Sequence, residues 1–532
     1  MPSFKLDDRE IPFEPGDTII RAAHRVGVDV PHYCWHPGLS VAANCRMCLV
    51  EVMPPPGRPA MLLDVLQWDD LHQTYVPQKK PKLQPACQQA AADGMVVKSQ
   101  TSEHAVKARS AVQELLLLNH PVDCPICDQA GECRLQDYWL EHQASKKRMR
   151  DEPIHKPKGV VFGPTIVYDA ERCIMCTRCV RVSAELAKDP VLSMRERGNL
   201  NEITVAPGRQ LDHNYTLMTE YVCPVGALTS SDFRFKARVW FLRSARTTCV
   251  GCATGCSSFS DFDPRNQKVY RYRPRENLAV NKYWMCDEGM LDYQRIHKDR
   301  VLEARIKGEG VTDASALEKA AEILRSASPQ KTAILLSAQH SNEDNQALLD
   351  LGKAVGALQI FYTGRPPGKG DDILMSEDKN PNVAGVLALS GGRAKPLTDL
   401  LAAIKEGKVA ALLALGSQIG SPTDAAALKD VKAFVAISTH EGPIAAAAAV
   451  VLPASSWAEA DGTFVNRLGV WQESDRAIIP QGQSRPAFKW VQDLAKQLNL
   501  TLPWKKASEL RASSRAAEAP VVAPSAPPPG GE

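Results

Sequence analysis

The sequence predicts a multi-domain protein that combines α+β and α/β parts. Its fifteen cysteines all lie between Cys34 and Cys286, and the remainder of the chain has none. After Cys286, short apolar runs alternate with helical stretches, which is typical of a parallel α/β sheet. With 532 residues, the chain is long enough for roughly three to four domains.

The composition is that of a soluble or peripheral protein. Apolar residues make up 44%, charged residues 23%, and the formal net charge is +3, so nothing indicates nucleic-acid binding. The longest apolar stretch, residues 444–452, is far shorter than the roughly 18 residues of a membrane span. The N-terminus has no basic segment followed by an apolar one, so we expect no secretion and a reducing compartment. An odd number of cysteines then favours metal or redox sites over disulfides.

The N-terminal region predicts two strands and a helix. Residues 4–14 alternate in polarity, with a turn expected at Asp7-Asp8. An apolar-periodic stretch over residues 19–26 predicts a short helix, which Gly27 ends.

Three further features divide the first half. Proline-rich ends mark residues 54–82 as a surface insertion. The pattern over residues 101–118 predicts an amphipathic helix. A proline-spaced linker over residues 153–164 indicates a domain boundary.

In the second half, Ser341 and Asp344 resemble a capping box that opens a helix ending near Gly356. No internal repeat is visible. The expected strands are residues 332–337, 358–362, 409–415, 433–438 and 449–452.

The first ligand set has a close pair of cysteines, one cysteine upstream and a distant fourth, as in plant-type two-iron (2Fe–2S) ferredoxins. Its members are Cys34, Cys45, Cys48 and Cys87. A structural zinc site is the alternative, which the Cys45/Cys48 pair alone would also fit. The preceding strand–strand–helix pattern favours the two-iron cluster. We expect His32 and His36, which flank Cys34, to be surface or packing residues.

The second set is the most specific. Three cysteines leave a four-iron (4Fe–4S) cluster one ligand short, no cysteine is spare, and His120 lies four residues before Cys124. A neutral imidazole in place of a thiolate should raise the reduction potential, as in His-ligated Rieske centres. The predicted ligands are His120, Cys124, Cys127 and Cys133.

The third set follows the bacterial-ferredoxin pattern of three closely spaced cysteines and a remote Cys-Pro, which predicts a four-iron cluster. Its members are Cys173, Cys176, Cys179 and Cys223, the last followed by Pro224.

The fourth set ends the cysteine-rich half. Taken alone it could form a zinc ribbon, but its spacing and the α/β region that follows favour a third four-iron cluster. Its members are Cys249, Cys252, Cys256 and Cys286. The four sets use all fifteen cysteines and one histidine, four ligands per cluster.

At these residues the chain resembles the family of the large iron–sulfur subunit of bacterial NADH-quinone oxidoreductase (respiratory complex I). A later stretch, residues 451–466, resembles the C-terminal domain that this family shares with molybdopterin oxidoreductases. The motifs of the first half are Val30-Pro31-His32-Tyr33-Cys34-Trp35-His36-Pro37, Asn44-Cys45-Arg46-Met47-Cys48-Leu49-Val50-Glu51-Val52 and the string from His120 to Cys133. The insertion over residues 54–82 is longer than usual for the family, and the C-terminal domain is short.

The resemblance implies a domain order. We expect a β-grasp 2Fe–2S ferredoxin domain, a helical His/Cys segment, a four-iron ferredoxin-like domain, a four-iron domain of molybdopterin-oxidoreductase type, an α/β domain without a pterin site, and a disordered Pro/Ala-rich tail. These occupy residues 1–98, 99–150, 151–240, 241–300, 301–506 and 507–532.

The resemblance also implies a function. Electrons would pass from a flavin-bearing, NADH-oxidising subunit through the sets at Cys34, Cys173 and Cys124 to a ferredoxin-like 4Fe–4S subunit and then to quinone. The cluster at Cys249 would lie off this route. The chain would be an electron-transfer subunit without catalytic residues of its own. With the other peripheral-arm subunits, it would lie on the cytoplasmic face of the bacterial inner membrane.

Three other functions remain open. A molybdenum or tungsten formate dehydrogenase would need a much longer pterin-binding region, usually a metal-binding Cys or selenocysteine beyond Cys286, and commonly a lysine where this chain has Glu288. A diaphorase subunit of an NAD-linked hydrogenase usually lacks the α/β extension. A zinc-stapled scaffold would contain no iron. Isolated glycine pairs near residues 391 and 416 are expected to be turns and not nucleotide-binding loops.

Overall fold

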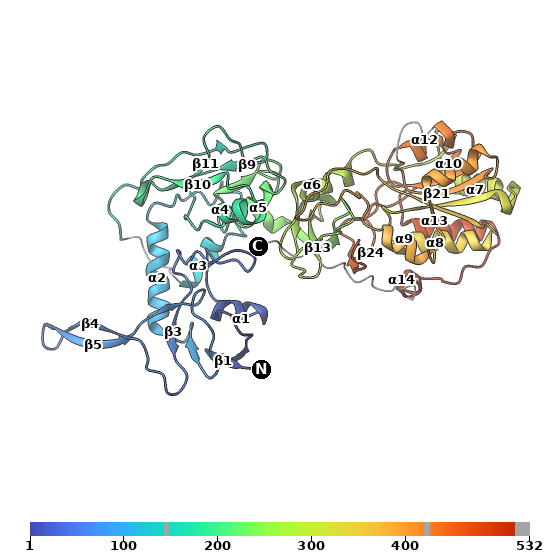
Figure 1. The fold of residues 1–532 in the computed structure, drawn as a ribbon. Helices are drawn as coiled ribbons and strands as arrows, with labels where there is room; N and C mark the ends of the chain where they lie inside the picture. Colours follow the sequence, from blue (N-terminus) through green and yellow to red (C-terminus); the bar gives the residue numbers. More distant parts are fainter. Residues whose placement is uncertain (143–147, 420–425, 516–532) are drawn as a thin grey trace, which may run out of the picture. The chain divides into compact units, whose positions relative to one another are not determined.

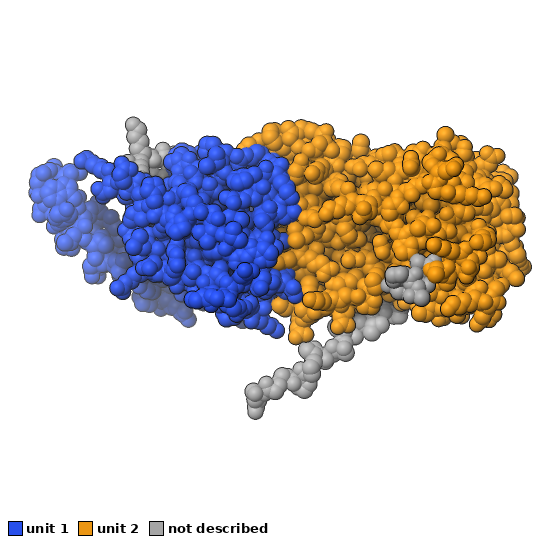
Figure 2. All heavy atoms as spheres, turned by 90° about the horizontal axis from the view of Figure 1, so that it is seen from above, with its two compact units in different colours: residues 1–239 blue, residues 240–532 orange. Residues whose placement is uncertain are grey.

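The computed structural model describes residues 1–142, 148–419 and 426–515, and the chain divides into two compact units, Met1–Val239 and Trp240–Glu532. Figure 2 colours the two units separately. None of the helices in the described ranges has the length and apolar character needed to cross a bilayer. The finer domain limits given above stay predictions.

The first unit begins with a five-stranded sheet in the order β2-β1-β7-β3-β6. The predicted hairpin is present, with Asp7 turning the chain at a positive φ of 50°. β7 lies parallel to β1, and α1 buries Ile19 and Ile20 in the core of this sheet. The elements are β1 (Ser3–Leu6), β2 (Arg9–Pro12), α1 (Ile19–Arg25), β3 (Leu49–Met53), β6 (Gln84–Pro85) and β7 (Val96–Lys98).

The predicted insertion forms a separate antiparallel hairpin of β4 (Leu62–Asp69) and β5 (Thr74–Pro81), which extends away from the sheet in Figure 1. Trp68 and Tyr75 face each other across it, with ring centroids 5.0 Å apart. Leu66 on the same face is 69% exposed. The sequence pattern indicated an insertion but not this strand pairing.

The rest of the first unit carries short elements around the cysteine loops. Helix α2 begins after Ser102, whose hydroxyl accepts a hydrogen bond from the Ala105 amide, a typical N-cap. β12, β9 and β8 form one small sheet, and β10 pairs with β11. The elements are α2 (Glu103–Leu117), α3 (Arg134–His142), β8 (Val160–Val161), β9 (Ile166–Tyr168), α4 (Arg178–Arg181), β10 (Leu192–Arg195), β11 (Glu202–Val205), α5 (Thr216–Tyr221) and β12 (Leu228–Ser230).

The second unit opens with a three-stranded antiparallel sheet and then the predicted α/β domain. The first sheet consists of β13 (Arg243–Thr248), β14 (Ser257–Asp263) and β15 (Lys268–Pro274), and α6 (Asp287–Leu291) follows it. A separate pair of strands, β24 (Gly462–Val465) and β25 (Trp471–Ser474), comes later in the chain.

The α/β domain has eight strands in the order β17-β16-β23-β22-β21-β18-β19-β20. The six strands from β23 to β20 are parallel, as predicted, but β16 and β17 add an antiparallel edge. The elements are β16 (Ala304–Ile306), β17 (Glu309–Val311), α7 (Asp313–Ser326), β18 (Thr332–Ser337), α8 (Asn342–Ala354), β19 (Gln359–Thr363), α9 (Val383–Leu389), β20 (Lys395–Pro396), α10 (Leu397–Lys405), β21 (Ala411–Leu415), β22 (Ala433–Ser438), α12 (Pro443–Ala447), β23 (Val450–Pro453), α13 (Ala487–Gln497) and α14 (Ala507–Arg515).

Alternate residues of the central strands pack against helices on opposite faces of this sheet. Leu413 and Leu415 of β21 join the core with α8 and α13, whereas Leu412 joins the core beneath α10. In Figure 1, α10 and α12 lie on one side and α8 and α13 on the other. A parallel sheet covered on both faces requires such continuous apolar runs, which is why its strands were readable from the sequence.

Two details of this domain compare instructively with prediction. The Ser341 hydroxyl accepts a hydrogen bond from the Asp344 amide, which confirms the predicted start of α8. The prediction of disorder from residue 507 is wrong for α14. This helix lacks proline, buries Leu510 and ties Arg511 to Glu343 of α8 with a 2.9 Å contact. Residues 516–532 lie outside the described residues.

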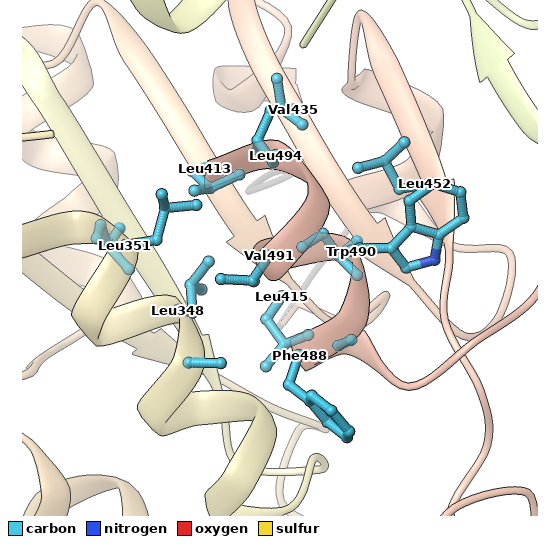
Figure 3. Close-up of a cluster of buried hydrophobic side chains, with 14 of the residues drawn as sticks. Leu348, Leu351, Leu413, Leu415, Val435, Leu452, Phe488, Trp490, Val491 and Leu494 are labelled. Atoms are coloured by element: carbon cyan, nitrogen blue, oxygen red, sulfur yellow. The ribbon is translucent and has the colours of Figure 1, made fainter. Parts of the chain in front are cut away.

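Trp490 is the largest side chain in the core that α8 and α13 form with the sheet (Figure 3). It is fully buried, and its Nε1 donates to the Pro453 carbonyl of β23 at 2.5 Å. We expect Trp490→Ala to lower the opening free energy of this domain by about 3–5 kcal/mol, because it leaves a cavity and an unpaired carbonyl. Hydrogen exchange of the β21 and β22 amides measures this loss. Trp240→Ala, at a side chain that is 58% exposed, is the control; equal protection in both variants would contradict the prediction.

Candidate iron–sulfur sites

The first set brings its four thiols together as two pairs. Cys34 is hydrogen bonded to Cys45, and Cys48 to Cys87. The hydrogen bond from Cys45 lowers the pKa of Cys34 to about 5, and that from Cys48 lowers the pKa of Cys87. A 2Fe–2S cluster takes two thiolates on each of its two irons. The pairing therefore matches the donor arrangement that such a cluster requires.

The loop that carries Cys45 and Cys48 has an unusual backbone. Ala43 and Arg46 have positive φ angles of 51° and 61°, a region that non-glycine residues seldom adopt. The Tyr33 amide lies 3.5 Å from the Cys45 sulfur and donates to it. Hydrogen bonds to ligand sulfurs are one of the means by which a protein adjusts a cluster's potential.

The third set, Cys173, Cys176, Cys179 and Cys223, lines one small cavity. Burial raises the pKa of Cys176 to about 11 and that of Cys223 to about 12. Tyr168 of β9 lines the same cavity and is hydrogen bonded to Cys173. Sequence reasoning missed this tyrosine, because it comes from a strand and not from the cysteine loop.

In the second unit, the fourth set also lines one cavity. Cys249 follows β13, Cys256 precedes β14, and Cys286 caps α6 by accepting a hydrogen bond from the Gly289 amide at 3.3 Å. Burial raises the pKa of Cys249 well above its usual value. The three-stranded sheet and the start of a helix thus hold the four thiols around one space.

A buried lysine borders this fourth site. Lys379 is 5% exposed, lines the cavity with the four cysteines, and its Nζ lies 2.8 Å from Glu288 Oε2. The sequence drew attention to Glu288 as an anion near the site but could not show that a cation from a distant loop pairs with it.

The second set is the least enclosed of the four. Cys124 is exposed, while burial raises the pKa of Cys133 to about 11, with Cys127 and Cys124 near enough to add to the shift. The His120 Nδ1 atom is buried and has no hydrogen-bond partner among the described residues. Burial, helped by the charge of Arg172, lowers the pKa of His120 to about 4, so the imidazole is neutral at pH 7 and has a lone pair to offer.

In the described residues, no three His, Cys, Asp or Glu side chains are close enough to hold a single metal ion. Each cysteine of a four-iron cluster binds a different iron, so the ligands of a cluster stand farther apart than those of an ion. The two enclosed cavities, each lined by four thiols, and the two thiol pairs fit clusters in donor type and number.

Contacts within the first unit place the third set between the first and the second. Arg178 and Arg181, beside Cys179, donate to the carbonyls of Trp35 and Cys34 in the first set's loop, each at 2.5 Å. On the other side, Arg172, next to Cys173, is 2.9 Å from Asp123, which precedes Cys124.

The second and third sets also meet directly. The Arg134 amide, which follows Cys133, donates to the Pro224 carbonyl at 3.2 Å. A Cβ atom added to Gly226 would lie only 2.3 Å from the Cys127 sulfur. The loops that carry the two sets are therefore packed against each other.

The α/β domain has its own cavity, of about 200 Å³, at the carboxyl ends of the parallel strands. Ser337, Thr439 and Ser455 line it, and the Ser455 hydroxyl is buried without a partner among the described residues. Pockets for drug-sized ligands are commonly about 300–1,000 Å³. The cavity is small for a pterin cofactor, and no cysteine beyond Cys286 is available to bind a metal there.

Comparison with known protein families matches four segments of the chain. The 2Fe-2S iron-sulfur cluster binding domain matches residues 2–102, and the NADH-ubiquinone oxidoreductase-G iron-sulfur binding region matches residues 109–148. The ferredoxin-like domain of NADH-quinone oxidoreductase subunit 3 matches residues 163–229, and the molybdopterin oxidoreductase family matches residues 319–497.

Relatives of this chain are subunits of NADH-quinone oxidoreductase or NADH dehydrogenase. The chain is 34% identical to the NADH-quinone oxidoreductase-G protein of Streptomyces coelicolor, over 64% of this chain and 38% of that protein. The chain belongs to the family of the large iron–sulfur subunit of NADH-quinone oxidoreductase. It is also 33% identical to the mitochondrial NADH dehydrogenase [ubiquinone] iron-sulfur protein 1 of Solanum tuberosum, over 72% of this chain and 48% of that protein.

Membership of this family accounts for the mixed fold, with its 2Fe–2S, ferredoxin-like and molybdopterin-oxidoreductase domains. The chain spans about half the length, or less, of the curated relatives that it matches. Among solved structures, it is similar to an NAD+-reducing NiFe hydrogenase, at 28% identity over 45% of this chain and 91% of that one, with a TM-score of 0.36.

The close contact at Gly226 gives a test of the second site. In Gly226→Ala, the new methyl group would occupy the space of the Cys127 sulfur. A free thiol could rotate away, but a thiolate bound to iron cannot. We expect the variant to lose the cluster of this set and keep the others, as measured by EPR and iron content.

Gly251→Ala is the matched control, because its Cβ would meet the Cys249 sulfur at an ordinary 3.4 Å. Retention of all EPR signals in the Gly226 variant would mean that Cys127 does not bind iron.

Proposed function

We propose that the chain is an electron-relay subunit of an NADH-quinone oxidoreductase. The observation that carries this proposal is the order of the three sites in the first unit. The loops of the third set contact those of the first set on one side and those of the second on the other. Three neighbouring one-electron carriers in one unit form a path for electrons.

The proposed ligands are those predicted from the sequence. One 2Fe–2S cluster and three 4Fe–4S clusters would take four ligands each, and no molybdopterin is expected. The sets are Cys34, Cys45, Cys48 and Cys87; His120, Cys124, Cys127 and Cys133; Cys173, Cys176, Cys179 and Cys223; and Cys249, Cys252, Cys256 and Cys286.

In this function the protein residues adjust potentials and hold the clusters in place. No acid–base or nucleophilic catalyst is proposed, because passing one electron between clusters requires no bond to form or break. Amides donate to sulfurs at Cys45, Cys173 and Cys286. These bonds stabilise the more negatively charged reduced state.

The proposal includes partners and a location. Electrons would enter from a flavin- and NADH-binding subunit and leave to a ferredoxin-like subunit with 4Fe–4S clusters, both within the peripheral arm of complex I. That arm would lie on the cytoplasmic face of the bacterial inner membrane, so this chain would contact the membrane only indirectly.

Two alternatives make different predictions about composition. A formate dehydrogenase catalytic subunit would contain molybdenum or tungsten, and a hydrogenase diaphorase subunit would purify with a nickel–iron subunit. The small cavity at the strand ends and the missing cysteine beyond residue 286 oppose the first. Purification from the native host with flavin and membrane subunits attached, and with no molybdenum, tungsten or nickel, would support the relay.

His120 gives a test of the second cluster. We expect His120→Cys to keep a four-iron cluster but lower its reduction potential, because a thiolate adds one negative charge to the ligand set. EPR-monitored redox titration measures the shift. His120→Ala, which removes the ligand without replacing it, should lose the cluster or its fourth protein ligand. An unchanged potential in the cysteine variant would refute the assignment of His120.

The relay itself is tested by interrupting it. In Cys176→Ala, the cluster of the third set should be lost. When the purified assembly is mixed with NADH and frozen rapidly, the cluster at Cys34 should still become reduced, and the cluster at Cys124 should not within one turnover.

Cys252→Ala, in the fourth set, is the control and should leave both signals as in the wild type. Full-rate reduction of the cluster at Cys124 in the Cys176 variant would contradict the proposed order.

A further inference from the structure

Two arginines lie between the first and third cluster sites. Arg178 and Arg181 are one turn apart at the two ends of α4, with the ligand Cys179 between them in the chain. Residues spaced by three share one face of a helix. Both guanidinium groups therefore project from the loop of the third set toward the same neighbour.

Arg178 links the two loops through backbone carbonyls. Its Nη2 donates to the Trp35 carbonyl at 2.5 Å, and its Nη1 donates to the Val222 carbonyl at 3.1 Å. Trp35 follows the first-set ligand Cys34, and Val222 precedes the third-set ligand Cys223. One side chain thus bonds next to a ligand of each cluster.

Arg181 makes the same kind of link at different positions. Its Nη2 donates to the carbonyl of Cys34 at 2.5 Å and to that of Cys176 at 3.2 Å, and so contacts a ligand residue of each set. Its Nη1 donates to the Ser40 carbonyl at 2.5 Å. A planar guanidinium holds several acceptors in fixed directions, which the single ammonium of lysine cannot do.

Both guanidinium groups are largely buried. Within the described ranges, no carboxylate lies within ion-pair distance of Arg178 or Arg181, although Arg181 is only 9% exposed and burial lowers the pKa of Arg178. The Arg178 Nε atom is buried without a hydrogen-bond partner in the same part of the chain. An unpaired buried cation is costly, so a negative charge is expected nearby.

The cysteines of both sites supply that charge. Thiolates at Cys34, Cys176 and Cys223 each favour the charged form of Arg178. Arg181 in turn favours the thiolate of Cys34, and both arginines favour that of Cys176. Clusters bound by four thiolates carry net negative charge that increases on reduction.

We propose that Arg178 and Arg181 are positioning residues for electron transfer between the first and third clusters. They fix the spacing of the two clusters by joining their loops, and their shared positive charge raises both reduction potentials together. In this step, one cluster is oxidised by one electron and the other is reduced by one, with no proton or bond change. This inference rests on the proposed function.

Substitutions that remove the charge test the electrostatic part. In the intact complex, Arg178→Gln and Arg181→Gln should each lower the reduction potentials of the clusters at Cys34 and Cys173, as measured by EPR redox titration. Arg209→Gln is the control, because Arg209 belongs to the same unit, is half-exposed and pairs with Asp189. Glutamine variants with full iron content and neither potential shifted would overturn the proposal, and so would a shift at only one cluster.

Substitutions that keep the charge test the spacing. Arg178→Lys and Arg181→Lys should leave both potentials near the wild-type values but weaken the magnetic coupling between the two reduced clusters, because lysine cannot bond both loops at once. Unchanged coupling would overturn the positioning role. If a glutamine variant loses iron, the lysine variants decide the question.

The wild-type protein separates this inference from the function on which it rests. If the wild type lacks iron and sulfide at the Cys34 or Cys173 set, the proposed function fails. If both clusters are present but insensitive to the arginines, the inference alone fails.

Discussion

The burial of the cysteine thiols is the constraint on which the rest of the structure depends. Burial raises the pKa of Cys173 and Cys176 to about 11 and those of Cys179 and Cys249 well above the usual value. A buried thiolate without a counter-charge is costly. Bound iron supplies that charge, so folding of these loops and binding of the clusters are expected to depend on each other.

The loops around the thiols show how the chain meets this constraint. Residues with positive φ, such as Arg46, Met175 and Thr177, turn the backbone near the cysteines, and amides then donate to sulfur. Cations add to this stabilisation at the third and fourth sites. Arg178 and Arg181 lie between two thiol sets, and Lys379 lies beside another, where Glu288 balances it. The same charges that favour thiolates also favour the reduced clusters.

The sequence predicted much of this fold because the predictive signals were local. The strands of the parallel sheet are continuous apolar runs, and Ser341 caps α8 with a residue three positions away. The four ligand sets could be proposed from spacing alone, because cluster-binding cysteines gather in short loops. The structure then brings the thiols of the first, third and fourth sets together.

The features that the sequence did not reveal depend on residues far apart in the chain. Arg181 contacts Cys34 across 147 residues, and Lys379 contacts Glu288 across 91. No periodicity records such contacts. The helix over residues 507–515 was missed because its stability comes from packing Leu510 against a distant core and not from its own composition.

The most direct test of the central claim is anomalous X-ray diffraction at the iron edge from anaerobically purified protein. The account predicts about fourteen irons per chain, as one two-iron site at Cys34 and three four-iron sites, with His120 bound to one of them. Single-atom peaks at the zinc edge in place of these clusters, or a four-iron site at Cys124 without His120 as a ligand, would contradict it.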